Sequence, residues 1–165
     1  MNVSIRPATE RDRALIRNIF NLYQNELSEY SHEFTHLDEN GYFAPDTVNE
    51  ILPFGDGVFP YIVTDGGKNV GFVMVTDSRY ALPGCDWRFE EFFLIKPARG
   101  KGAALKAAKL AMENRPGRWC LSVFTENARA KAFWKKLIAD LGAEYAEAPG
   151  VSGMTDLCFT APSLR

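Results

Sequence analysis

The chain has 165 residues, close to the usual size of one domain, and its 46% hydrophobic and 24% charged residues are ordinary for a globular protein. Nineteen basic and 21 acidic side chains give a net charge of −2, so the total charge gives no indication of nucleic-acid binding. No apolar run approaches the roughly 18 residues that span a bilayer, and we expect no membrane partner.

Two features bear on the location of the protein. The N-terminus carries Arg6 and Pro7 where a signal peptide needs its apolar stretch. Cys85, Cys120 and Cys158 are odd in number, widely spaced and without a C-x-x-C pair, which argues against a disulfide framework. We therefore expect three buried thiols and a reducing, cytoplasmic location.

Charge is distributed unevenly along the chain. Residues 1–17 carry a net charge of +2, residues 18–67 contain nine acids and no Lys or Arg, and the remaining residues carry +5. This split suggests a basic part that meets an anionic ligand and an acidic part that faces a different partner. The alternative is that both parts are solvated surface.

The hydrophobic pattern predicts alternating strands and helices. In chain order we expect a strand at 3–6, an amphipathic helix at 10–30, a loop at 31–45, a short helix at 46–52, a hairpin with strands at 61–64 and 70–76, a long aromatic strand at 87–95, a helix at 103–114, a strand at 119–124, a helix from 127 to 141, and final strands near 145 and at 154–159. The alternation, without repeats or a linker, predicts an α/β fold: a single domain over residues 1–165 with a central mixed sheet flanked by helices.

The strongest local signal is a glycine-containing turn between the long aromatic strand and the helix that follows it. Gly100 and Gly102 let backbone N–H groups turn inward without a Cβ in the way, and the start of the helix offers further unpaired N–H groups. Arg99 and Lys101 add positive charge. Together these features predict a cradle for a pyrophosphate, and an ordinary strand–helix turn is the alternative.

Two segments resemble motifs of one family. The segment Arg99-Gly100-Lys101-Gly102-Ala103-Ala104 resembles the Arg/Gln-x-x-Gly-x-Gly/Ala signature of the GNAT superfamily, whose members are acetyl-coenzyme A dependent N-acetyltransferases. The segment that runs from Asn127 through Trp134 is similar to the family's Asn-x-x-Ala-x-x-x-Tyr segment, which opens the next helix. The order of the expected elements also matches, so the resemblance covers nearly the whole chain.

The resemblance implies acetyl-CoA as cosubstrate, no metal, and a set of residue roles. Backbone groups of Phe93 and Leu94 would pair with the pantetheine arm, and the Leu94 amide would donate to the oxyanion. The amides of residues 99–104 would hold the pyrophosphate, and Asn127 would contact the cofactor near its pantetheine end. The resemblance also implies an acceptor wall formed by the first helix and the loop after it, and homodimers through the C-terminal strands.

Direct attack of an amine on a thioester requires a base for the amine proton, and Glu90 and Glu91 are adjacent candidates. Strict alternation places Glu91 with Phe89 and Phe93, among apolar side chains that raise the pKa of a carboxylate. We favour Glu91 as the base or as the group that orients a water, with Glu90 as the alternative because a β-bulge would break the alternation. Solvated or salt-bridged carboxylates are the remaining interpretation.

The chain departs from the family pattern at Trp134, where the family often has a tyrosine that protonates the leaving thiolate. An indole N–H donates a hydrogen bond but does not release a proton near neutral pH. A thiolate with a pKa of about 8.5 leaves with little assistance, so activity is compatible with this change. Trp134 is otherwise a wall of the thioester tunnel or part of the core.

A competing motif, His32-Glu33-Phe34-Thr35-His36, matches the H-E-x-x-H pattern of zinc proteases. Its context is poor, because it follows the expected end of the first helix and no third histidine exists, so that a carboxylate such as Glu50 would have to complete the site. A surface loop is the simpler interpretation. A catalytically degenerate acyl-CoA-binding module is a third hypothesis.

The sequence therefore predicts acetyl transfer from acetyl-CoA to an amine on a small molecule or a peptide. Residues 18–52, which form the expected acceptor wall, hold seven acids, no Lys or Arg, and aromatic side chains that include Tyr23, Tyr30, Phe34, Tyr42 and Phe43. Carboxylates beside aromatic faces favour a cationic amine. Acids that only solvate the loop are the alternative.

Overall fold

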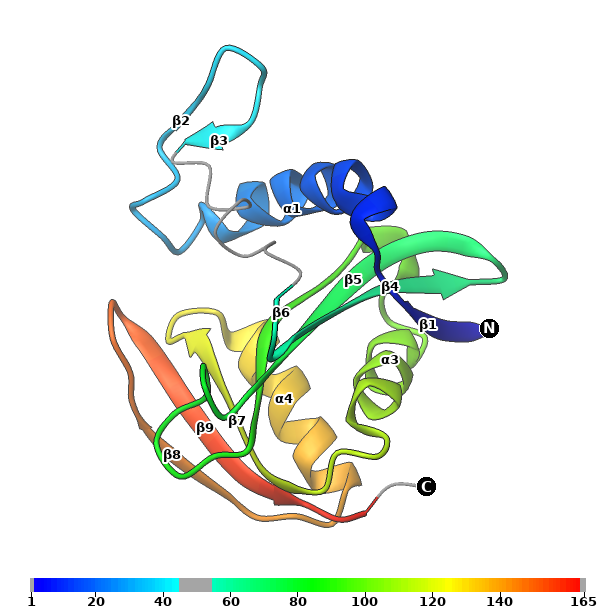
Figure 1. Ribbon diagram of the computed structural model, residues 1–165. Helices are drawn as coiled ribbons and strands as arrows, with labels where there is room; N and C mark the ends of the chain where they lie inside the picture. The colour runs from blue at the N-terminus through cyan, green and yellow to red at the C-terminus, as the bar shows by residue number, and fades with distance from the viewer. Residues whose placement is uncertain (1, 45–54, 164–165) are drawn as a thin grey trace.

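The computed structural model describes residues 2–44 and 55–163, and the short helix expected at 46–52 lies outside them (Figure 1). The elements in chain order are β1 Val3–Pro7, α1 Arg13–Leu27, β2 His36–Leu37, β3 Phe43–Ala44, β4 Val58–Asp65, β5 Lys68–Asp77, β6 Trp87–Leu94, α3 Ala103–Met112, β7 Gly117–Phe124, α4 Ala128–Asp140, β8 Tyr145–Pro149 and β9 Met154–Ala161. Among the described residues, no helix is long and apolar enough to cross a membrane.

One seven-stranded sheet, in the order β1-β4-β5-β6-β7-β9-β8, forms the centre of the molecule. All neighbouring strands are antiparallel except β6 and β7, which are parallel. Helix α1 covers one face of the sheet, whereas α3 and α4 cover the other (Figure 1). The predicted mixed sheet flanked by helices is confirmed.

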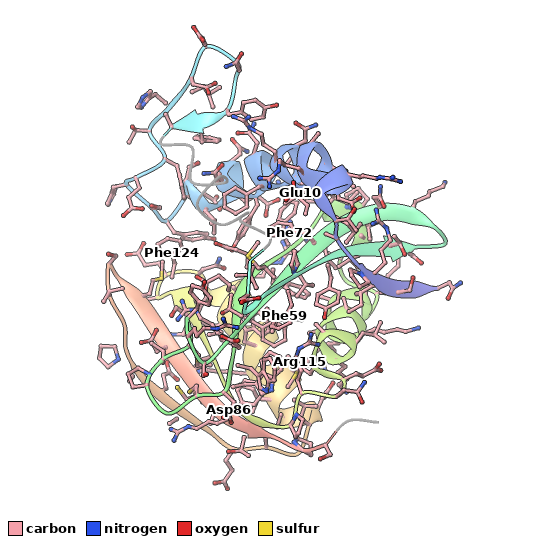
Figure 2. All side chains as sticks on the ribbon, viewed as in Figure 1. Glu10, Phe59, Phe72, Asp86, Arg115 and Phe124 are labelled. Carbon is pink, nitrogen blue, oxygen red and sulfur yellow. The ribbon has the colours of Figure 1, made fainter. Side chains whose placement is uncertain are left out.

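The helices bind the sheet through two separate apolar clusters. On one face, Ile16, Ile19 and Phe20 of α1 pack against strand residues that include Phe72, which lies beneath the helix (Figure 2). This stripe is the one that the helical spacing of the sequence predicts. On the opposite face, α3 contributes mostly small side chains and α4 contributes large ones, and the buried members are Ala103, Ala107, Ala108, Ala111, Met112, Trp134, Leu137 and Ile138.

Strands β6 and β7 part halfway along their length. They pair only from Trp87 to Phe89 on β6, although β6 continues to Leu94 and β7 continues to Phe124. Beyond Phe89, the edge of β6 that faces β7 therefore has no strand partner. Backbone N–H and C=O groups on such an edge need another partner, and an extended ligand arm can supply one.

A β-bulge distorts β6 at the same point. Met74 of β5 pairs with Glu91 and the next residue of β5, Val75, pairs with Phe89, so Glu90 is an extra residue on β6. A bulge inserts one residue, interrupts the alternation of side chains and bends the strand. Here the bulge lies where β6 leaves β7.

Candidate active site

The Glu91 carboxylate lies on the face of the sheet that α1 covers, close enough to the Tyr23 hydroxyl of α1 for the two groups to affect each other's pKa. Tyr23 also packs against Phe93, with 5.5 Å between ring centroids. Burial and, second, the negative charge of Glu90 raise the pKa of Glu91 to about 8, although Tyr23 and Arg88 act in the opposite direction. Glu91 thus has the pKa expected of a base that works near neutral pH.

Glu90 is held differently from its neighbour. Its carboxylate lies 2.9 Å from Nε of Arg88 and accepts a long hydrogen bond of 3.5 Å from the Thr76 hydroxyl. Arg88 in turn donates to Ser122 on β7 at 3.2 Å, and Ser122 donates to Asp156 on β9 at 2.6 Å. Glu90 therefore belongs to a polar chain that ties β6 to β7 and β9 where β6 and β7 begin to part.

The strict alternation expected along β6 is wrong at Phe89, because of the bulge at Glu90. Phe89 packs against Trp134 of α4 at 4.8 Å between ring centroids, on the face opposite to Glu91. Glu91 shares its face with Phe93, as expected. Glu90 forms an ion pair with Arg88 and lies close enough to Glu91 to raise the pKa of that residue. The two carboxylates therefore lie near each other and do not point to opposite faces of the sheet.

The glycine turn follows β6 directly. Gly100 and Gly102 have φ values of +85° and +79°, a left-handed conformation that favours glycine, and a Cβ at either position would meet no atom within 4 Å. Gly102 is the N-cap of α3 and provides no side-chain hydrogen bond to its first N–H groups. Open space above unpaired helix-terminal N–H groups is suited to an anion.

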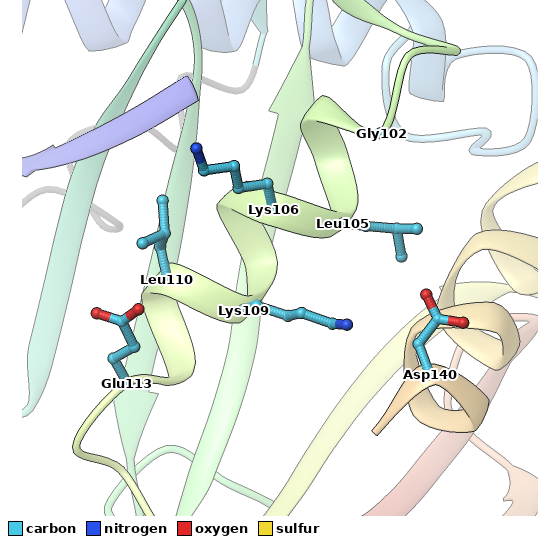
Figure 3. Close-up of a pocket in the computed structure, with 7 residues that line it drawn as sticks. All are labelled: Gly102, Leu105, Lys106, Lys109, Leu110, Glu113 and Asp140. Carbon is cyan, nitrogen blue, oxygen red and sulfur yellow. The ribbon is translucent and has the colours of Figure 1, made fainter. Parts of the chain in front are cut away.

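Basic side chains continue from this turn along α3. A groove of about 410 Å³ begins at Gly102 and runs toward α4, with Lys106 and Lys109 among the side chains that line it (Figure 3). Glu113 and Asp140 line the same groove farther from the turn. The positive charge is therefore concentrated on the part of α3 nearest the turn.

Arg99 is engaged with the protein itself. Its Nε donates to the Leu94 carbonyl at 2.6 Å, and its two terminal nitrogens each lie 2.9 Å from a carboxylate oxygen of Glu26 in α1. Arg99 thus links the end of β6 to the end of α1, and Glu26 balances its charge. The expected contact between the Arg99 charge and a pyrophosphate stays a prediction, as does the role of Lys101, which is exposed in the turn.

Two residues of the second motif have clear structural roles. Asn127 caps α4, with its side-chain oxygen accepting from the Ala130 N–H at 3.0 Å. Trp134 is 7% exposed and packs against Phe89 and Phe92 between β6 and α4. The structure thus favours the core interpretation of Trp134, and the contact of Asn127 with a cofactor stays a prediction.

The H-E-x-x-H motif does not lie on a helix. Its first residues follow α1 in a loop, and His36 begins the two-residue strand β2, where Nδ1 lies 3.1 Å from the Thr35 hydroxyl. The one-turn spacing that brings two histidines to one metal in a helix is therefore lost. Glu50 lies outside the described residues, and the zinc-site alternative loses its structural basis.

The expected acceptor wall consists of α1 and the hairpin formed by β2 and β3. Asn21 of α1 holds this hairpin, because its amide donates to the Gly41 carbonyl at 3.2 Å and accepts from the Phe43 N–H at 3.0 Å. The guanidinium of Arg17 lies 4.0 Å from the Tyr42 ring centroid, so an internal cation already covers that ring. Tyr30 stacks on Phe124 at the end of β7 (Figure 2).

The acids of this wall are in different states. Glu26 is paired with Arg99, and Asp38 accepts from two N–H groups of its own hairpin, which lower its pKa. Asp46 and Glu50 lie outside the described residues. The exposed acids are Glu29, Glu33 and Glu39.

Sequence reasoning missed the link between Tyr23 and Glu91 and the link between Glu26 and Arg99. Both pairs join α1 to the region around β6, across more than sixty residues of chain. Tyr23 was expected only in the apolar stripe of the first helix and among the aromatic side chains of the acceptor wall. No local pattern identifies such a partner.

Solved structures share this architecture over nearly the whole chain. An acetyltransferase from Thermus thermophilus has a TM-score of 0.68 at 19% identity, with 96% of both chains covered. The aminoglycoside acetyltransferase AAC(6')-Ib, in complex with ribostamycin and coenzyme A, has a TM-score of 0.69 at 19% identity, covering 98% of this chain and 94% of its own. A GNAT-family acetyltransferase from Streptococcus agalactiae has a TM-score of 0.68 at 16% identity, covering 98% and 96%.

No protein-family model and no curated protein matches the sequence. At the identities of the solved structures, the likeness establishes the fold. The chain has the fold of the GNAT acetyltransferases, as its two motifs predicted.

Proposed function

We propose that this protein is an N-acetyltransferase that moves an acetyl group from acetyl-CoA to a primary amine by direct attack. One observation carries the proposal: β6 loses its partner β7 beside a half-buried Glu91 and leads into a glycine turn at the start of α3. A base, an unpaired strand edge and an anion site thus lie within one short stretch of chain. These three features correspond to three parts of the reaction with acetyl-CoA: the attack on its thioester, its extended pantetheine arm and its pyrophosphate.

In this proposal the unpaired edge of β6 at Phe93 and Leu94 binds the pantetheine arm of acetyl-CoA. Of the amides expected to bind its pyrophosphate, those of residues 99–104, the Arg99 N–H is already donated to the Lys96 carbonyl at 3.1 Å, so the N–H groups of residues 100–104 take this role. The Leu94 N–H donates to the thioester oxygen. The related fold of AAC(6')-Ib, which has been solved with coenzyme A, supports this mode of binding. Lys106 and Lys109 bring positive charge to the neighbouring groove, which favours the phosphate of coenzyme A that is not part of the pyrophosphate.

Glu91 acts in the chemical step. The amine nitrogen attacks the carbonyl carbon of the thioester, and its proton passes to the Glu91 carboxylate directly or through a water. The negative charge that develops on the carbonyl oxygen is stabilised by a backbone N–H of β6. The C–S bond then breaks, the sulfur leaves as a thiolate, and the acetyl group remains on the nitrogen as an amide.

The departing thiolate has no tyrosine acid at position 134. Trp134 is packed in the core, so the thiolate leaves unprotonated or takes a proton from solvent. This observation favours one second candidate, a module that binds acyl-CoA without turnover. The two candidates differ in whether free coenzyme A accumulates when an amine is added.

We further propose that the acceptor amine is cationic. Glu29, Glu33 and Glu39 are exposed on the α1 and hairpin side of the sheet, and the described residues of 18–44 contain no Lys or Arg. The ribostamycin complex of AAC(6')-Ib supports a small-molecule acceptor on this fold. A polyamine, an aminoglycoside-like compound and a basic side chain share the required charge.

The test of the proposed function is thiol release from acetyl-CoA with matched cationic, neutral and anionic amines. We expect release that depends on the amine, with the highest kcat/KM for the cationic acceptor and a lower apparent affinity at higher ionic strength. Binding of acetyl-CoA without release for any amine would support the silent module instead. Equal or faster release with the anionic amine would contradict the cationic acceptor alone.

A further inference from the structure

All three cysteines of the chain come together in space. Cys85 lies in the loop between β5 and β6, Cys120 lies on β7 and Cys158 lies on β9. The sulfur atoms of Cys85 and Cys158 are 3.9 Å apart, and Cys120 is the direct cross-strand partner of Cys158. Cys85 and Cys120 are buried as expected, whereas Cys158 is only half-buried.

The loop that carries Cys85 is held over β7 and β9 by specific bonds. The Cys85 N–H donates to the Leu82 carbonyl at 3.0 Å, and the Leu82 N–H donates to the Cys120 sulfur at 3.3 Å. Asp86 and Arg118 exchange two bonds of 2.8 Å, from the Asp86 N–H to the Arg118 carbonyl and from the Arg118 N–H to the Asp86 carboxylate. The contact between Cys85 and Cys158 is therefore part of a defined loop conformation.

We propose that Cys85 and Cys158 form an oxidation site, at which a peroxide converts the two thiols into a reversible disulfide. The pair is chosen on geometry. The sulfur atoms of Cys85 and Cys158 already lie 3.9 Å apart. Cys120 is directly opposed to Cys158 on the neighbouring antiparallel strand, where Cβ atoms are about 4.5–5.5 Å apart, at or beyond the upper end of the 3.5–4.5 Å that a disulfide requires.

Burial and bonding support the same choice. Cys120 is fully buried, and its sulfur accepts from Leu82 and lies 3.6 Å from the Trp87 carbonyl. Cys158 is the most accessible of the three thiols, so a small oxidant reaches it first. Cys85 lies in a loop rather than in a sheet strand, and a rotation of its side chain closes the remaining gap.

The chemistry balances with one peroxide molecule. The Cys158 thiol loses its proton, the thiolate attacks one peroxide oxygen, and the O–O bond breaks to give a sulfenic acid and a hydroxide, which takes up the released proton and becomes water. The Cys85 sulfur then attacks the sulfenic sulfur, the S–O bond breaks, and a second water leaves with the thiol proton. Two thiols are oxidised to a disulfide, hydrogen peroxide is reduced to two waters, and a dithiol reductant reverses the bond.

The surrounding charges set the conditions for this reaction. Burial raises the pKa of both thiols, and Cys120 beside Cys85 and Asp156 beside Cys158 act in the same direction, whereas Arg118 lowers both. The thiolate is therefore the minor form at neutral pH, and oxidation becomes faster as the pH rises. In a reducing compartment the bond forms only while peroxide outpaces reduction.

The test uses the whole protein, reduced, desalted and treated with hydrogen peroxide at mildly alkaline pH. Remaining thiols are then alkylated, and the protein is digested without reductant for mass spectrometry. We expect a cross-linked peptide pair that joins Cys85 to Cys158 with the loss of two hydrogens, and its disappearance after reduction by dithiothreitol. Because the bond joins residues 73 positions apart, we also expect the melting temperature to rise by about 4–16 °C.

The matched variants are Cys85→Ser, Cys158→Ser and Cys120→Ala. The cross-link and the rise in melting temperature should be lost in the two serine variants and kept in Cys120→Ala. Peroxide treatment that leaves Cys85 and Cys158 reduced, or that joins Cys120 or a second molecule instead, would overturn the proposal. The mass spectra of the parent protein decide this even if a variant fails to fold.

Discussion

Replacing Glu91 with glutamine removes a carboxylate on β6 whose pKa is raised to about 8. The substitution keeps the shape of the side chain and a hydrogen-bonding partner for Tyr23 but removes the base. A general base contributes about 10²–10⁴ to the rate, so we expect kcat/KM to fall by about 100-fold or more at pH 8. The rise of kcat/KM with pH through the Glu91 pKa should also disappear.

The same substitution should also remove a pH dependence of the free energy of unfolding that Glu91 gives to the parent protein. This effect is measured without an activity assay. The pKa of Glu91 is about 8 in the folded chain, against 4.5 for an unperturbed glutamate. Between these values the folded chain holds a proton that the unfolded chain releases, so the free energy of unfolding falls as the pH rises, by at most about 1.4 kcal/mol per pH unit. Solvent reaches the half-buried carboxylate and reduces this slope, and we expect a total loss of about 2 kcal/mol across the window.

The assay is thiol release between about pH 6 and pH 9.5, with an acceptor amine that stays neutral across that range. The free energy of unfolding is measured in urea near pH 4.5 and near pH 8, the two ends of the stability window. Glu90→Gln is the matched control. Because the Glu90 charge raises the pKa of Glu91, this control should shift the pH profile to lower pH without abolishing it. If Glu91→Gln keeps both the pH-dependent rise in kcat/KM and the pH-dependent stability of the parent, Glu91 is neither the base nor the titrating group.

Three further experiments, which use four substitutions, test contacts around the site. Tyr23→Phe removes the hydroxyl that lowers the pKa of Glu91, so the pH profile should move to higher pH in the same assay; a shift to lower pH would contradict this interaction. Arg99→Ala and Glu26→Gln should show a coupling of about 1–2 kcal/mol in a double-mutant cycle of unfolding free energies, because the ion pair is bidentate and half-buried. Additive effects of the two substitutions would show that this ion pair does not contribute to stability. Gly71→Ala should reduce the free energy of unfolding by about 1–3 kcal/mol, because the added Cβ would overlap the β6 backbone. An unchanged free energy of unfolding would contradict this close approach of β5 and β6.

The fold was predictable because most of its signals are local. The apolar stripe of α1 and the alternation of strands with helices placed the elements in the right order. The prediction of β4 began after Pro60, yet the strand starts at Val58. The last pair between β1 and β4 joins Pro7 to Tyr61, so Pro60 lies just beyond the end of β1. Because Pro60 has no partner on β1, its missing N–H costs no hydrogen bond to that strand.

The site was predictable only in part. The turn at Gly100 and Gly102 has the left-handed backbone that its glycines indicated, because that conformation depends on the residues themselves. The position of Glu91 depends on a bulge that forms only when β5 pairs with β6, and its raised pKa depends on burial under α1. Such long-range effects have no signature in the local sequence.

The central claim is that the unpaired edge of β6 and the glycine turn bind acetyl-CoA, and isothermal titration tests it most directly. The parent chain should bind acetyl-CoA with one site and a dissociation constant in the micromolar range, and should not bind zinc stoichiometrically. Gly102→Val should bind acetyl-CoA much more weakly while remaining folded, because a branched side chain would occupy the open space above the turn. Stoichiometric zinc binding without acetyl-CoA binding, or equal acetyl-CoA affinity in Gly102→Val, would contradict the account.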